Sequence, residues 1–283
     1  MAMDALAPDI AIQKRDELVE LGYTLIPGVL KDPMLGELQR WSQAMFDRVP
    51  VEHKYRYQGS DIHVYTERLW RETNVEKSIR QMPDPIVEKI IDYPPQMQVC
   101  RQLQLEGLQA HDVLILLSKP PCGPPLYWHQ DYTNWNSPEA ATPWPTMIFF
   151  SYYMGDTTRQ NGCLKVIPGS HRKRDKLHDL LPNAHTPEIQ AIADLADPAF
   201  MDHPDSVDLP VQAGDLVIAD ARLLHATWAN QTQQRRSLVL AWHQVFPFPT
   251  PPSWWDRDIP DVIKHADPGA TYEATRTPSS YLQ

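Results

Sequence analysis

The chain has 283 residues, with 26 Lys and Arg against 36 Asp and Glu, which gives a formal net charge of −10. A chain this acidic lacks the broad positive field that DNA- and RNA-binding proteins need. We therefore expect no nucleic-acid partner. Hydrophobic residues make up 42% of the chain, which excludes disorder. Its apolar runs are far shorter than the ~20 residues that cross a bilayer, so we expect no membrane partner.

Cysteine usage and the first residues of the sequence favour a cytoplasmic protein. Cys100, Cys122 and Cys163 are widely spaced and form neither a disulfide framework nor a CxxC metal pair. The opening MAMDALAPDI does not read as a secretory signal, which would begin with charged and then apolar residues. We therefore expect reduced thiols in a cytoplasmic, compact and loop-rich protein.

The first part of the chain reads as helical. Residues 9–49 carry apolar side chains at three-to-four spacing on either side of a break at Gly22, and residues 79–108 show a similar pattern. Prolines within the second stretch act as starts or stops of helices. The pattern predicts a mostly helical flank over about residues 1–110.

The character of the sequence changes after residue 111. Short runs rich in β-branched and aromatic residues alternate with segments rich in Pro, Gly and Asn, which is typical of strands in an antiparallel barrel or jelly roll. The runs are residues 113–117, 147–154, 163–167, 215–219 and 237–242. We expect one mainly β domain with its core over about 111–246 and a Pro- and Trp-rich C-terminal extension over 247–283.

The segment 127–132 (YWHQDY) carries the first chemical signal. In a strand, the side chains of His129 and Asp131 project from the same face and offer half of a site for a divalent transition metal. His225 follows a predicted strand and is the attractive third ligand. Two imidazoles and one carboxylate leave other coordination positions open, as non-haem Fe(II) oxygenases require for a cosubstrate and O₂.

A dianionic cosubstrate bound to such an ion needs a cation at its far end. Arg236, eleven residues after His225, can bind a carboxylate through two parallel hydrogen bonds, and Thr227 can donate a hydroxyl to the same group. Arg235 is the alternative anchor, but strand alternation makes the two arginines point oppositely, and the spacing favours Arg236.

These motifs, taken in order, resemble the phytanoyl-CoA dioxygenase family of Fe(II)/2-oxoglutarate oxygenases, which includes ectoine hydroxylase. The resemblance covers roughly residues 16–246. The matching motifs are 129–131 (HQD), 161–171 (NGCLKVIPGSH), 213–216 (AGDL), and His225 with Arg236 eleven residues on.

The resemblance implies a double-stranded β-helix (jelly-roll, cupin-like) core with flanking α-helices. It also implies Fe(II) held by His129, Asp131 and His225, with 2-oxoglutarate anchored by Arg236. Family members convert 2-oxoglutarate and O₂ to succinate and CO₂ and oxidise a C–H bond, with hydroxylation as the default outcome. Halogenating relatives lack the carboxylate that Asp131 supplies here, so halogenation is disfavoured.

Other positions bear on the substrate. Relatives often carry a Trp ten residues before the Asn of the Asn-Gly pair, where this chain has Ser151. Tyr153 or Trp135 would compensate for it. Tyr127 and Trp135 are either core residues or the lining of an apolar substrate pocket. Lys119 is either a cosubstrate contact or a surface residue.

The substrate we expect is a small, partly apolar molecule of the natural-product type. The basic run 171–174 (HRKR) reads as a solvated loop, with a phosphate contact for a CoA-type substrate as the alternative.

Two other functions remain possible at this point. A metal-dependent hydrolase would use the same three ligands but gives Arg236 no role. A non-catalytic β-barrel binding module has no physical reason to keep two imidazoles and a carboxylate together. The sequence leaves the oligomeric state open between monomer and homodimer.

Overall fold

Two β-sheets form the centre of the computed structural model, which describes residues 6–49, 60–73, 78–267 and 269–270. The large sheet has the strand order β1-β9-β6-β11-β4-β2-β3 and the small one β5-β10-β7-β8. The strands of the large sheet are β1 (Tyr23–Ile26), β2 (Ser60–Tyr65), β3 (Gln81–Pro83), β4 (Gln109–Lys119), β6 (Met147–Tyr153), β9 (Leu216–Asp220) and β11 (Arg236–Gln244). Those of the small sheet are β5 (Leu126–His129), β7 (Leu164–Val166), β8 (Val207–Leu209) and β10 (His225–Thr227).

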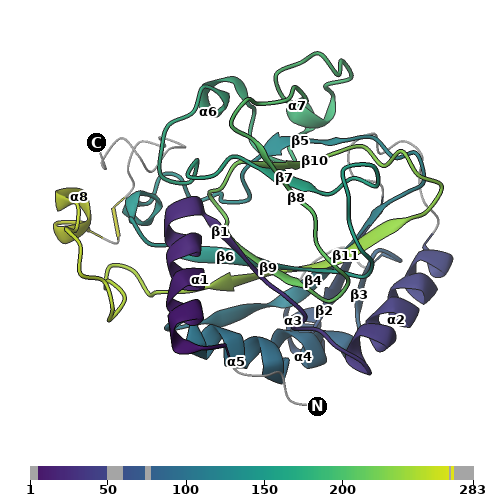
Figure 1. Cartoon of the computed structure of the whole chain (residues 1–283), viewed down its shortest axis with the longest axis horizontal. Coiled ribbons are helices and arrows are strands. Elements are labelled where there is room, and N and C mark those ends of the chain that lie inside the picture. The colour runs from purple at the N-terminus through teal and green to yellow at the C-terminus, as the bar shows by residue number, and fades with distance from the viewer. Residues whose placement is uncertain (1–5, 50–59, 74–77, 268, 271–283) are drawn as a thin grey trace.

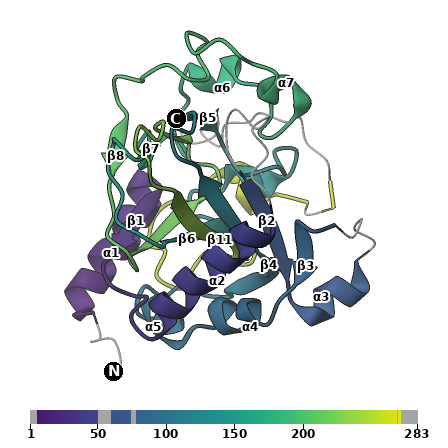
Figure 2. The same cartoon turned by 90° about the vertical axis from the view of Figure 1, so that its right-hand side faces the viewer.

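Helices lie outside both sheets. Figure 1 and Figure 2 show α2, α4 and α5 on the side of the large sheet, and α6 and α7 on the opposite side of the molecule, above the small sheet. The helices are α1 (Pro8–Leu21), α2 (Met34–Arg48), α3 (Glu67–Glu72), α4 (Ile86–Ile91), α5 (Pro94–Gln102), α6 (Leu177–Leu180), α7 (Pro187–Gln190) and α8 (Asp261–Lys264), with a 3-10 turn η1 (Pro138–Ala141). The molecule is therefore layered as helix, sheet, sheet and helix.

Alternation along the strands of the large sheet divides the core in two. Ile148 and Phe150 of β6 pack with the helices, whereas Phe149 and Tyr153 of the same strand pack with residues of the small sheet such as Val166. The space between the sheets is the interior of a double-stranded β-helix. The predicted mainly β jelly-roll core with flanking helices is confirmed.

The five predicted strand runs overlap β4, β6, β7, β9 and β11, and none extends more than one residue beyond the strand at either end. The N-terminal flank contains more sheet than its pattern indicated, because β1, β2 and β3 also join the large sheet. Gly22 ends α1 with a φ of +85°, and a Cβ there would stand 2.5 Å from His171 Nδ1. The chain can therefore turn tightly at Gly22 and continue as β1, which pairs with β9.

Two further expectations concern the rest of the chain. Of the C-terminal extension, residues 271–283 lie outside the described residues. Among the residues that the structure describes, none of the helices has the length and apolar character needed to cross a bilayer.

Candidate metal and cosubstrate site

Two histidines meet across neighbouring strands of the small sheet. His129 of β5 and His225 of β10 are direct partners in the antiparallel register, and their ring centroids are 4.1 Å apart. In each ring, Nδ1 lies 3.0 Å from a main-chain oxygen two residues earlier, that of Tyr127 or Leu223. Because a carbonyl only accepts, Nδ1 carries the proton in the neutral ring and Nε2 keeps its lone pair. This is the support that metal-binding histidines usually receive.

Asp131 completes this cluster from just beyond the end of β5. The strand ends at His129, so Asp131 is not a strand residue as we expected, yet its carboxylate still faces the imidazoles. Its Oδ1 lies 3.5 Å from His129 Nε2 and its Oδ2 lies 3.9 Å from His225 Nε2, with the side chain 5% exposed. Burial raises the pKa of Asp131, but the imidazoles, His225 first, outweigh it and hold that pKa well below its usual value.

A buried arginine fixes the backbone next to Asp131. Arg222 donates from Nε to Asp220 Oδ1 at 3.0 Å and from Nη2 to Oδ2 at 2.7 Å. Its main-chain oxygen accepts from the Gln130 side chain, and Ala221 accepts from the Tyr132 N–H at 2.9 Å. Its guanidinium also binds the main-chain oxygens of Ala140, Thr142 and Trp144. The segment with Asp131 and the turn before His225 are therefore held together.

The structure adds a residue that the sequence reasoning missed. The sequence predicted His225 as the third ligand, whereas the group whose ligand atoms all lie within 4.8 Å of one another is His129, Asp131 and His185. His185 Nε2 is 3.8 Å from Asp131 Oδ1. His185 comes from the segment between α6 and α7 and follows no recognisable motif. His185 is far from His129 and Asp131 in the sequence, and no pattern around it could have identified it as part of this cluster.

Arg236 and Lys119 form a buried pair of cations. They are cross-strand partners at one end of β11 and β4 and are 8% and 3% exposed. Of the two alternatives for Lys119, the surface residue is thereby excluded. Lys119 Nζ donates to the Pro124 oxygen at 2.6 Å. Nε and Nη1 of Arg236 have no hydrogen-bond partner among the described residues. Burial lowers the pKa of both groups, and the nearby Arg236 lowers that of Lys119 further.

The surroundings of Arg236 show which arginine faces the interior. The Arg236 guanidinium lies 5.4 Å from the centroid of the Tyr153 ring, whereas that of Arg235 lies over Phe46 of α2 and donates to Ser118 Oγ at 2.8 Å. The two arginines thus point to opposite faces of β11. A cavity of about 290 Å³ is lined by both arginines and does not distinguish them.

Thr227 lies on β10, two residues after His225. It is buried, and its hydroxyl has no hydrogen-bond partner within the described part of the chain. Alternation along β10 places it on the same face of the strand as His225. An unpaired buried hydroxyl is costly unless a ligand or water binds it.

The predicted substrate residues are all buried. The Tyr127 ring lies 5.2 Å from that of His129, and its hydroxyl lies 2.8 Å from His185 Nδ1. Trp135 packs on Tyr132, with ring centroids 4.9 Å apart. Their role in substrate binding stays a prediction.

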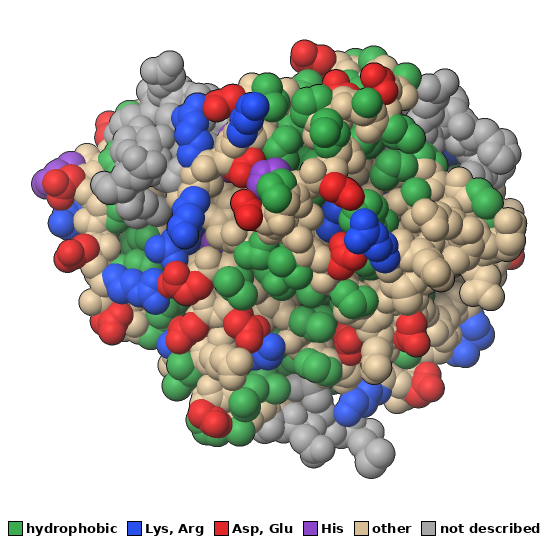
Figure 3. Space-filling model, turned by 45° about the horizontal axis from the view of Figure 1, so that its top comes forward, with side chains coloured by type: hydrophobic (Ala, Val, Ile, Leu, Met, Phe, Trp, Pro, Cys, Tyr) green, Lys and Arg blue, Asp and Glu red, His purple; other side chains and the backbone are tan. Residues whose placement is uncertain are grey.

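Two of the residues in the basic run 171–174 form ion pairs with acidic side chains. His171 is buried, Arg172 pairs with Glu20 at 2.7 Å, and Arg174 pairs with Asp179. Figure 3 shows basic and acidic side chains interspersed on the face that it draws. The two arginines bind carboxylates, which leaves less of their charge for a phosphate.

The sequence profile described as "Phytanoyl-CoA dioxygenase (PhyH)" matches residues 18–238. The chain belongs to the phytanoyl-CoA dioxygenase family. Within it, the chain is 29% identical over 154 residues to a "Probable alpha-ketoglutarate-dependent hypophosphite dioxygenase" of Stutzerimonas stutzeri, which covers 54% of this chain and 49% of that protein. It is 28% identical over 122 residues to an "Ectoine dioxygenase" of Sphingopyxis alaskensis, covering 39% and 38%. The chain therefore spans half or less of the length of these curated relatives.

Solved structures share the fold of this family member. The epimerase SnoN in complex with Fe³⁺, alpha ketoglutarate and nogalamycin RO has a TM-score of 0.57 at 18% identity, over 94% of this chain and 95% of that chain. EctD from S. alaskensis with 2-oxoglutarate and 5-hydroxyectoine has a TM-score of 0.55 at 20% identity, over 86% and 78%.

Proposed function

We propose that this member of the phytanoyl-CoA dioxygenase family is an Fe(II)/2-oxoglutarate-dependent dioxygenase. It would hydroxylate a C–H bond of a small, partly apolar molecule and release succinate and CO₂. The observation that carries the proposal is that Nε and Nη1 of the buried Arg236 have no hydrogen-bond partner in the described part of the chain. A buried cation with free donors is costly, and it has a purpose if a carboxylate binds it during turnover.

The donor set fits ferrous iron. His129, Asp131 and His225 supply two imidazoles and one carboxylate, which suits non-haem Fe(II) with open positions. We assign His225 as the third permanent ligand because it is buried and its Nδ1 proton is directed to the Leu223 oxygen. Iron bound there would supply the reaction of 2-oxoglutarate with O₂ and the oxidation of the substrate C–H bond.

The remaining residues of the site would bind and orient the cosubstrate. Arg236 can donate two parallel hydrogen bonds to the distal carboxylate of 2-oxoglutarate, and the Thr227 hydroxyl can donate a third. Lys119 adds positive charge beside Arg236 while its Nζ is held by the Pro124 oxygen. A hydrolase would have no use for this buried positive charge.

Aromatic side chains near these groups support an apolar component in the substrate. Tyr127 borders the imidazoles and Tyr153 borders Arg236, so both stand where a small molecule would exclude water. Trp135 belongs to the same proposal, although it packs on Tyr132. Two of the solved relatives are named for nogalamycin biosynthesis, which agrees with a substrate of the natural-product type.

We also infer a cytoplasmic location. The three cysteines of the chain form no disulfide with one another, and Cys100 and Cys163 are buried. Unpaired thiols are usual in a reducing compartment.

Succinate formation tests the proposal. Purified protein supplied with Fe(II), ascorbate and 2-oxoglutarate is screened against apolar small molecules. We expect a subset of compounds to raise succinate release and to gain the mass of one oxygen atom. The Arg236→Gln variant should need far more 2-oxoglutarate for the same rate. Substrate turnover that proceeds equally without 2-oxoglutarate or without O₂ would refute the proposed function.

A further inference from the structure

A third imidazole faces the carboxylate of Asp131. The ring centroid of His185 lies 5.1 Å from that of His129, edge to face, and its Nε2 lies 3.8 Å from Asp131 Oδ1. His225 stands at the other oxygen of the same carboxylate, 3.9 Å away. Three imidazole rings therefore surround one buried acid.

His185 is held in this place by Tyr127. The Tyr127 hydroxyl lies 2.8 Å from His185 Nδ1 and accepts a hydrogen bond from the His185 main-chain N–H at 3.1 Å. The φ of His185 is +59°, in the left-handed region that few residues other than glycine, Asn, Asp and His adopt. Residues held in such conformations cluster at functional sites. The two hydrogen-bond contacts with Tyr127 hold the His185 ring beside Asp131.

His185 nevertheless differs from the other two histidines. His129 and His225 are buried on paired strands, whereas His185 lies between two short helices with its side chain 43% exposed. Its Nδ1 faces a hydroxyl, which can donate or accept, so no fixed proton position commits Nε2 to one role. An imidazole with this attachment can approach a metal ion and also leave it.

We propose that His185 is a fourth, displaceable ligand of the metal ion. The inference rests on the proposed function, with His129, Asp131 and His225 as the permanent ligands. These three leave three positions open on a six-coordinate ion, of which 2-oxoglutarate needs two and O₂ the third. Bound there in the resting protein, His185 would occupy one of them and would have to leave before O₂ could bind, so it would restrain 2-oxoglutarate consumption when substrate is absent.

Cobalt titration of the metal-free protein tests the coordination directly. The variant is His185→Asn, because Asn tolerates positive φ and its amide can still reach Tyr127, but it lacks an atom at the position of Nε2. Without 2-oxoglutarate, we expect His185→Asn to bind Co(II) at least about tenfold more weakly than the unmodified protein. A lost ligand should also change the visible absorption of the bound Co(II). Binding curves and spectra that coincide would overturn the proposal.

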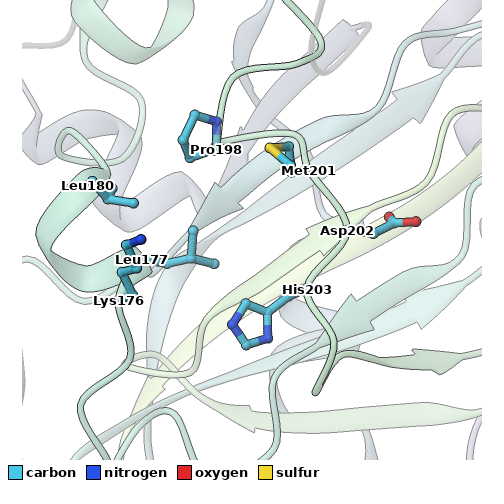
Figure 4. Close-up of a pocket in the computed structure, with 7 residues that line it drawn as sticks. All are labelled: Lys176, Leu177, Leu180, Pro198, Met201, Asp202 and His203. Carbon is cyan, nitrogen blue, oxygen red and sulfur yellow. The ribbon is translucent and has the colours of Figure 1, made fainter.

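A matched control uses another histidine from the same part of the chain. His203 pairs with Asp175 at 3.2 Å and lines a pocket of about 210 Å³ near α6, shown in Figure 4. His203→Asn makes the same chemical change away from Asp131, and we expect Co(II) binding to stay as in the unmodified protein. Equal weakening in both variants would show a general effect of the segment and would contradict a ligand role for His185.

Oxygen uptake gives a second measurement. With Fe(II) and 2-oxoglutarate but no substrate, His185→Asn should consume O₂ several-fold faster than the unmodified protein, because the coordination position for O₂ is free.

The Co(II) titration separates this proposal from the proposed function. An unmodified protein that binds no Co(II) would refute the proposed function as well. An unmodified protein that binds Co(II) and 2-oxoglutarate like the His185→Asn variant would refute the His185 proposal alone.

Discussion

Two arginines, both nearly removed from solvent, are in opposite electrostatic situations. Arg222, 1% exposed, donates to both oxygens of Asp220 and to three main-chain carbonyls. Arg236, 8% exposed, leaves Nε and Nη1 without a partner among the described residues, and its cross-strand neighbour Lys119 is another cation. Burial lowers the pKa of each guanidinium, but only Arg222 has a carboxylate that reverses the shift and raises it.

This difference separates structure from function at the level of single side chains. A buried charge with all donors bound stabilises one arrangement of the chain, here the backbone beside Asp131. A buried charge with free donors lowers the stability of the free protein, and it is useful if a ligand supplies the missing carboxylate. The same residue type therefore acts as a structural residue in one place and as a binding residue in the other.

The largest effect should come from breaking the satisfied pair. Arg222→Met leaves the Asp220 carboxylate buried without its partner, and we expect a loss of about 3–5 kcal/mol in the free energy of unfolding. Urea unfolding followed by circular dichroism measures it. The double variant Arg222→Met with Asp220→Leu removes both charges and should recover part of the loss. A change in the single variant of under about 1 kcal/mol would contradict the structural role.

Asp131 offers the corresponding test for a carboxylate. Asp131→Ala removes the only acidic group of the proposed metal site, and we expect Co(II) or Fe(II) affinity to fall by about a hundredfold or more and 2-oxoglutarate turnover to disappear. Urea unfolding of the metal-free variant serves as the check that it still folds. Normal metal affinity would show that the ligand assignment is wrong.

Arg236 should respond with opposite signs in two measurements. Arg236→Gln removes a charge-assisted pair of hydrogen bonds worth about 1.5–3 kcal/mol, so we expect roughly ten- to a hundredfold weaker 2-oxoglutarate binding to the metal-loaded protein. Without cosubstrate, the variant should be as stable as the unmodified protein or more so, because an unpaired buried charge is gone. Arg235→Gln is the control, and it should leave 2-oxoglutarate binding unchanged. If Arg236→Gln strongly lowers the free energy of unfolding instead, Arg236 is a structural residue like Arg222.

The last effect concerns pH. Burial lowers the pKa of His243, which stacks on Phe150, to about 4, whereas an unfolded chain has the ordinary value of about 6.5. Between those values the unfolded state binds a proton that the folded state does not. Stability should therefore fall as pH falls, by up to about 1.4 kcal/mol per pH unit.

His243→Leu should flatten this dependence, measured by urea unfolding at several pH values between the two pKa values. His171 and His225, whose pKa values burial also lowers to about 4, still contribute a slope in this variant. An unchanged slope in His243→Leu would show that His243 is not the group that titrates.

The sequence predicted the parts of the fold that depend on local pattern. Short runs rich in β-branched and aromatic residues marked the strands β4, β6, β7, β9 and β11, and strand alternation separated Arg236 from Arg235. The short distance from His129 to Asp131 along the chain made their proximity predictable. These features are predictable because each depends only on residues that are close together in the sequence.

Features that depend on long-range packing were not predictable in this way. The strand β2 (SDIHVY) mixes polar and apolar residues and is stabilised by pairing with β4. His185 reaches Asp131 because Tyr127 binds it across 58 positions of the chain. Arg222 pairs with Asp220, two residues away, but the main-chain carbonyls that also accept from Arg222 lie about eighty residues earlier in the chain. No pattern within a short window of sequence carries these contacts.

The most direct test of the account is the visible spectrum of the anaerobic protein with Fe(II) and 2-oxoglutarate. If the imidazoles and Asp131 hold iron while Arg236 holds the far carboxylate, the unmodified protein should develop the weak charge-transfer band of the chelate. Arg236→Gln should need much more 2-oxoglutarate to reach the same band, and Asp131→Ala should show none. A folded, iron-loaded protein without the band at saturating 2-oxoglutarate would contradict the account.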